Sequence, residues 1–165
     1  MTDANPRILR VEARTEVRVT EQDVTPPQGD GDATVIRVRG KGPMTSTDPR
    51  FVGTFEADAV IIVDNEGEGV SRDDWRVVDD ETGETKVRGT AHGIHNDPNP
   101  IRAVTIGRFA DGDHFFGNAR VTLPEPGTDD PIVIEYGGPG LSDPENRAVA
   151  VSGECEPILK PATPD

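Results

Sequence analysis

Polar and apolar residues alternate with a period of two along two long segments of the chain. In residues 8–20, apolar or small residues occupy every second position, and charged residues occupy most of the positions between them. In residues 51–64, the odd-numbered positions carry no charge, and residues 60–63 are all β-branched. Successive residues of a strand point to opposite faces of a sheet, so both segments are predicted as strands. The second strand is expected to be buried on both faces towards its end.

Shorter runs of the same kind fill the rest of the chain. Turn residues separate these runs about every ten to fifteen positions. The Asp111-Gly112-Asp113 turn lies between two alternating runs and predicts a tight hairpin. Loops are expected at residues 21–32, 42–50, 65–74 and 137–147. In the third of these, Ser71 and Asp74 are expected to cap a single helical turn. The other predicted strands cover residues 33–41, 75–80, 85–94, 101–110, 114–123, 132–136 and 148–153.

These elements describe an all-β protein. Their hairpin connections predict a single antiparallel β-barrel of about eight or nine strands, with a β-sandwich as the alternative. The barrel domain is expected over residues 7–158, between a disordered tail at 1–6 and a C-terminal tail at 159–165.

Small residues on the apolar strand faces favour the barrel, because closing a sheet requires bends and close backbone approach. The interior of such a barrel is either a flattened, tightly packed core or a cavity that holds one small ligand. The small residues in question are Gly53, Ala57, Ala59, Gly89, Ala91, Gly93, Ala103, Gly107, Gly117 and Ala119.

Charge is the most unusual feature of the composition. Acidic residues outnumber basic ones by 31 to 17, and the formal net charge is −14 at pH 7. Such a surface repels phosphate backbones and anionic lipid, so neither nucleic acid nor a membrane is expected as a partner. A salt-rich environment is one hypothesis for this excess of acid. The lone cysteine, Cys155, excludes intrachain disulfides, and the first residues lack the apolar segment of a secretory signal, so a cytoplasmic location is expected.

Histidines give the first candidate for a site. His92 and His95 have the spacing of metal ligands, with Asp97 close by. The third histidine, His114, is expected far from them, because it follows the next reversal of the chain. All three are therefore interpreted as surface residues, and no metal or other cofactor is expected.

Other reactive patterns are weaker. Glu56 and Asp58 lie two residues apart on one strand face, a spacing that suits a glycosidic bond, but a solvated face is the favoured interpretation. Cys155 lies between two glutamates that would raise the pKa of its thiol, so it is interpreted as structural. The acidic pairs in the loops have too few ligands for calcium. The glycine-rich stretch at 137–140 lacks the lysine of a phosphate loop and is interpreted as a turn.

Large side chains near the small-residue faces remain as candidates. Trp75 and Tyr136 are the only tryptophan and tyrosine of the chain. The ring of Tyr136 is expected to enter the interior, because it shares a strand face with two isoleucines. The predicted ligand-binding residues are Phe55, Ala57, Ala59, Trp75 and Tyr136, and no catalytic residue is assigned.

The function predicted from these features is binding of an apolar small molecule inside the barrel. The protein would act by binding alone, or as a cofactor-independent cyclase or isomerase that shapes its substrate and excludes water. The organisation is similar to that of small calycin and allene-oxide-cyclase-type barrels. This is an analogy of architecture only, because no sequence motif of the chain supports it. The alternative is a self-associating structural β-sandwich without catalytic activity, which would use the charged strand face at residues 10–18. A homo-oligomer is compatible with both.

Overall fold

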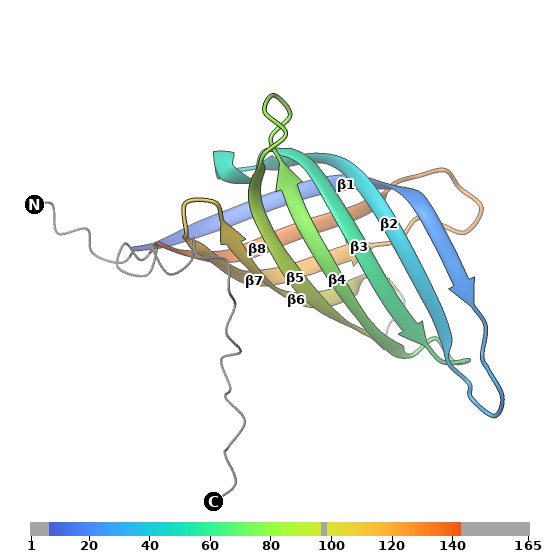
Figure 1. Cartoon of the computed structure of the whole chain (residues 1–165). Helices are drawn as coiled ribbons and strands as arrows, with labels where there is room; N and C mark the ends of the chain where they lie inside the picture. The colour runs from blue at the N-terminus through green and yellow to red at the C-terminus, as the bar shows by residue number, and fades with distance from the viewer. Residues whose placement is uncertain (1–6, 97–98, 143–165) are drawn as a thin grey trace, which may run out of the picture.

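The computed structural model describes residues 7–96 and 99–142, which form one closed barrel of antiparallel strands (Figure 1). Each strand pairs with its neighbours in sequence, and the last strand pairs with the first to complete the barrel. The predicted antiparallel barrel is confirmed, and the β-sandwich alternative is wrong. The strands are β1 (Arg7–Thr25), β2 (Thr34–Ser46), β3 (Gly53–Val63), β4 (Gly69–Val78), β5 (Thr85–His95), β6 (Ile101–Phe109), β7 (His114–Thr122) and β8 (Ile132–Ser142).

Several strands continue through segments that were predicted as loops. β1 runs five residues into the expected loop at 21–32, and β2 extends to Ser46. β4 begins at Gly69, so the expected helical turn at Ser71 is wrong. β8 continues through the glycine-rich stretch at 137–140, where Gly137 pairs with Glu12 of β1. In a closed barrel each strand pairs with two neighbours, and this pairing satisfies the hydrogen-bonding groups of the backbone. The strands therefore continue through segments whose residues locally favour a turn. The strand predicted at 148–153, Cys155 and both predicted tails lie outside the described residues.

The two ends of the barrel differ. The β2–β3, β4–β5 and β6–β7 connections meet at one end, here named the closed end, and the other four connections form the opposite loop end (Figure 1). At the closed end lies η1 (Pro49–Phe51), a single turn of 3-10 helix. The Asp48 side chain caps this turn by accepting a hydrogen bond from the Arg50 backbone N–H at 2.9 Å. Phe51 was predicted as the first residue of a strand; it lies in this turn instead and is fully buried.

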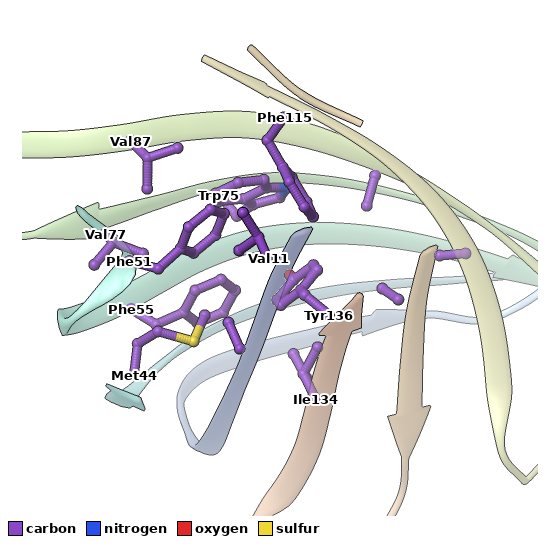
Figure 2. Close-up of a cluster of buried hydrophobic side chains, with 14 of the residues drawn as sticks. Val11, Met44, Phe51, Phe55, Trp75, Val77, Val87, Phe115, Ile134 and Tyr136 are labelled. Atoms are coloured by element: carbon purple, nitrogen blue, oxygen red, sulfur yellow. The ribbon is translucent and has the colours of Figure 1, made fainter. Parts of the chain in front are cut away.

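The barrel interior contains a cluster of buried aromatic side chains, Phe51 of η1 among them (Figure 2). The centroid of the Phe51 ring lies 5.9 Å from that of Trp75, 5.3 Å from that of Phe109 and 5.1 Å from that of Phe115. Tilted and edge-on contacts of this kind add to the gain from burying the rings. Every aromatic side chain except Phe116 is buried, so a chain with few aromatic residues concentrates them in one place.

The outer face of the barrel is solvent-exposed. Ile62 of β3 is 41% exposed, so the prediction that this strand is buried on both faces is wrong. The barrel has a single wall, and no second layer of described residues covers β3 from outside. Within the described ranges, no helix has the length and hydropathy needed to cross a membrane.

Candidate functional site

An aromatic layer spans the barrel near its middle. Trp75 of β4 and Tyr136 of β8 approach from opposite walls, and their ring centroids are 5.5 Å apart (Figure 2). Phe55 of β3 lies 6.3 Å from Trp75 and 6.0 Å from Tyr136, again between ring centroids. All three side chains are buried. The structure therefore brings together three of the five residues predicted to bind a ligand, as a layer between the closed end and the loop end.

The indole of Trp75 is held in one orientation. Its Nε1–H donates a hydrogen bond of 2.9 Å to the hydroxyl of Thr105, which in turn donates to the carbonyl oxygen of Thr90 at 2.9 Å. The ring lies over Gly89 and Gly107, and a Cβ at Gly107 would come 2.9 Å from it. Gly89 of β5 and Gly107 of β6 thus leave room for the indole, which fills this part of the interior as a packed core.

Replacing Thr105 by valine is expected to destabilise the barrel by about 1–3 kcal/mol, because a buried donor on Trp75 loses its acceptor. Valine has nearly the same shape, so the loss reports the hydrogen bond more than a cavity. Urea denaturation followed by the fluorescence of Trp75 measures it. Thr45→Val on the exposed face of β2 is the control, and equal effects of the two changes would contradict the role given to Thr105.

The two predicted alanines lie at different levels of the barrel. Ala57 is the strand partner of Trp75 and packs against the core. Ala59 is the strand partner of Asp73, one step closer to the loop end. On β3 and β4, the inward-facing residues on this side of the layer, Ala59, Ile61 and Ser71, are only half-buried, whereas Ala91 and His95 on β5 are buried. Solvent therefore reaches the interior from the loop end along β3 and β4.

Asp73 is the functional candidate that the sequence analysis missed. Its side chain follows Trp75 and Val77 on the inward face of β4, whereas Arg72 and Asp74 are exposed on the outer face. Across the described residues, no hydrogen bond or ion pair reaches its carboxylate. Burial, and secondarily the charge of Asp74, raise the pKa of Asp73 to about 6.

Tyr136 is electrostatically coupled to this carboxylate. Burial, reinforced by the charge of Asp73, raises the pKa of the Tyr136 hydroxyl well above its usual range. Within the described residues this hydroxyl has no hydrogen-bond partner. It is therefore a neutral phenol at physiological pH, free to donate a hydrogen bond to a ligand.

Two fully buried polar side-chain atoms lack a partner in the part of the chain that the structure describes. They are the hydroxyl of Thr15 on β1 and Nε2 of His95 on β5. His95 is only 6% exposed, so its interpretation as a surface residue is wrong. Burial lowers its pKa. Because β5 continues to His95, this residue falls on the same inward face as Ala91 and Gly93, whereas His92 points outward and is exposed.

One signal in the sequence points to Asp73. Gly69, Ser71, Asp73, Trp75 and Val77 occupy alternate positions, so extending the predicted strand by six residues places Asp73 on the face of Trp75. The adjacent glycines and acidic residues favoured a loop instead. Pairing of β4 with both β3 and β5 over this segment overrides that local preference.

The other carboxylate candidates have structural partners. Glu56 accepts a hydrogen bond of 2.7 Å from Arg76, and Asp58 accepts one of 2.8 Å from Arg39, both on the outer face. This supports their interpretation as a solvated face. The described residues contain no group of three or more side chains suited to a metal ion.

A groove with a volume of about 890 Å³ crosses the outer face of β2, β1, β8, β7 and β6. Exposed side chains of both signs line it, including Arg14, Arg102, Arg120 and Glu135. Its charged side chains are exposed to solvent, whereas Asp73 faces the interior with a raised pKa, so the interior is the stronger candidate site.

Comparison of the chain with protein-family models, with curated proteins and with solved structures finds no match.

Proposed function

We propose that the barrel binds a small, mainly apolar molecule in its loop-end half, against the layer formed by Trp75 and Tyr136. The observation that carries this proposal is an inward-facing carboxylate, Asp73, that meets no cation and no hydrogen-bond donor among the described residues. A ligand-binding site of this kind combines apolar walls with a few oriented polar groups.

The walls around Asp73 suit an apolar ligand. Ala59 and Ile61 of β3 face the interior and are half-buried, and Ala91 of β5 is the other strand partner of Asp73. Leaving polar groups unpaired in a protein interior costs free energy, so folds retain them mainly where they have a task. Both binding alone and catalysis by a cofactor-independent cyclase or isomerase would use this site.

Titration with the neutral fluorescent probe N-phenyl-1-naphthylamine tests the binding. Trp75 is the only tryptophan, so a probe bound against it is expected to quench its emission with one-to-one saturation. Ala59→Phe is expected to weaken binding by at least about tenfold, since the new ring would lie beside Asp73 in the proposed site. Each tenfold change in affinity corresponds to about 1.4 kcal/mol. Ile62→Phe adds the same ring to the outer face of β3 and is the matched control.

The absence of saturable quenching, or equal binding by Ala59→Phe and the natural sequence, would contradict the proposed site. Ala57→Phe is a poor test, because Ala57 packs against Trp75 and a larger side chain there disturbs the core itself.

Self-association remains a second candidate function, supported by a different surface from the one predicted. Arg14 on the charged face of β1 pairs with Glu16 of its own strand at 2.9 Å. By contrast, Val104, Ile106 and Phe116 leave apolar side chains exposed on adjacent strands, with Phe116 56% exposed. Light scattering tests this function, and a monomer at high protein concentration would exclude it.

A further inference from the structure

The surroundings of Asp73 leave its carboxylate facing the barrel interior without a compensating charge. Its strand partners are Ala59 on β3 and Ala91 on β5, which carry no charge. Tyr136 lies on β8, near enough for the charge of Asp73 to help raise the pKa of its hydroxyl, and Asp74 is the charged neighbour of Asp73 on the outer face of β4. A carboxylate in such a position is a stronger base than one in water, because burial disfavours its charge.

Resting on the proposed binding of an apolar molecule, we propose that Asp73 is a general base that removes a proton from carbon, with the Tyr136 hydroxyl donating a hydrogen bond to the oxygen that becomes negative. The substrate class is a small apolar carbonyl compound with an acidic C–H bond next to the carbonyl, such as a β,γ-unsaturated ketone. The reaction is a proton-shift isomerisation.

The step balances without a cofactor. A carboxylate oxygen of Asp73 forms a bond to the α-proton, and the C–H electron pair becomes a new C=C bond as the carbonyl π pair moves onto oxygen. The Tyr136 O–H donates to this enolate oxygen. The carbonyl then re-forms, and the γ-carbon takes the proton back from Asp73. Nothing is oxidised or reduced, and the carboxylate is regenerated.

Two properties of the site favour this chemistry over binding alone. General bases work best when their pKa lies near the working pH, and the pKa of Asp73 is raised to about 6. The raised pKa of Tyr136 keeps its hydroxyl protonated, so it remains a donor when negative charge develops nearby. Among the described residues, the remaining titratable side chain on the inward face is His95, which lies opposite Gly69 and therefore four positions along β4 from Asp73.

Elimination of 5-nitrobenzisoxazole tests for the base without knowledge of the natural substrate. A base takes the proton from its ring carbon, the C–H pair becomes part of a nitrile, and the N–O bond breaks to release a coloured phenolate. The natural sequence is expected to accelerate this reaction with a rate that rises through a midpoint near pH 6. Asp73→Asn is expected to lower the rate on the order of 100-fold and to remove that midpoint.

Asp74→Asn is the matched control, because Asp74 is the exposed neighbour on the same strand. Its rate is expected to stay close to that of the natural sequence, and its midpoint to move only slightly to lower pH, since the charge of Asp74 is the secondary cause of the raised pKa of Asp73. Tyr136→Phe is expected to lower kcat by about tenfold or more while keeping a pH midpoint, since it removes only the hydrogen bond to the leaving oxygen. Asp73→Asn should still bind N-phenyl-1-naphthylamine, which shows that it is folded.

The outcomes separate the two proposals. If the natural sequence binds the naphthylamine but eliminates no faster than Asp73→Asn, the general base is overturned and the binding site stands. If the naphthylamine does not bind and elimination is also independent of Asp73, both proposals fail. Elimination that depends on Asp73 but not on Asp74 supports the base.

Discussion

Replacing Arg50 by methionine is expected to lower the free energy of unfolding by about 3–5 kcal/mol, the range for removing one partner of a buried ion pair. The Arg50 guanidinium lies between three aspartates at the closed end. It contacts the carboxylates of Asp48 at 2.8 Å, Asp111 at 2.8 Å and Asp113 at 2.6 Å, and it covers the ring of Phe109 at 3.8 Å from the centroid. The side chain of Asp113 is only 3% exposed, so without the guanidinium a negative charge would stay buried.

The same network predicts how this effect depends on pH. Burial opposes ionisation of Asp48, but the hydrogen bonds from Arg50 outweigh it and hold the pKa of Asp48 below its usual range. A lowered pKa in the folded state stabilises the protein above the unfolded pKa of about 4, and this stability is lost as the pH falls through the folded pKa. The difference in the free energy of unfolding between Arg50→Met and the natural sequence is therefore expected to be largest at pH 7 and smaller at pH 3.

Urea denaturation followed by Trp75 fluorescence at both pH values measures this effect. Arg39→Met is the matched control, because Arg39 also contacts two carboxylates, those of Glu21 and Asp58, but in an exposed position. Exposed ion pairs contribute about 0–1 kcal/mol, so this change is expected to be nearly neutral. Similar losses of stability for the two variants would show that burial of the Arg50 network does not strengthen its contribution to stability.

Truncating Phe51 to alanine is expected to cost about 3–5 kcal/mol, because it removes a fully buried ring and leaves a cavity. Phe51 contacts the rings of Trp75, Phe109 and Phe115, which come from three different strands. Neighbouring side chains on barrel strands cannot move inward far enough to refill that space. Because Phe51 also packs on Trp75, the change is expected to alter the fluorescence of the folded protein.

Val52→Ala is the control for Phe51→Ala. Val52 is the next residue along the chain and is 43% exposed, so its truncation is expected to change stability by less than about 0.5 kcal/mol. The midpoint of urea denaturation is compared for the two variants and the natural sequence. A loss below about 1 kcal/mol for Phe51→Ala would mean that η1 does not anchor the core.

The residues expected to contribute most to stability and the residues of the candidate site therefore lie towards different ends of one barrel. The closed end contains the Arg50 network and the rings around Phe51, whereas Asp73 lies on the loop-end side among half-buried residues of β3 and β4. Trp75 and Tyr136 belong to both halves, since one side of their layer packs on the core and the other faces Asp73. A site with unpaired polar groups is tolerated because the other half supplies the packing that holds the fold.

Period-two patterning predicted the strands and most of their inward faces, and the small residues on those faces favoured the barrel over a β-sandwich. In β1 the alternation separates buried Val11, Ala13 and Val17 from exposed charged residues, and the structure shows the same division. The inward positions of Phe55 and Tyr136 were also predicted from this alternation, and both side chains are buried. These predictions succeeded because side-chain alternation is a property of each strand and needs no knowledge of its neighbours.

The sequence by itself determined the strand class, the inward face of most strands and the acidic outer surface. Only the tertiary structure decided where strands end, what faces Asp73 and which small residues seat an aromatic ring. Strand ends depend on pairing with neighbours, as β4 and β8 show. The state of a carboxylate depends on charges and burial contributed by other strands, and Tyr136 lies 63 positions from Asp73 in the chain. Such cross-barrel proximity leaves no local pattern, because closure of the barrel alone creates it.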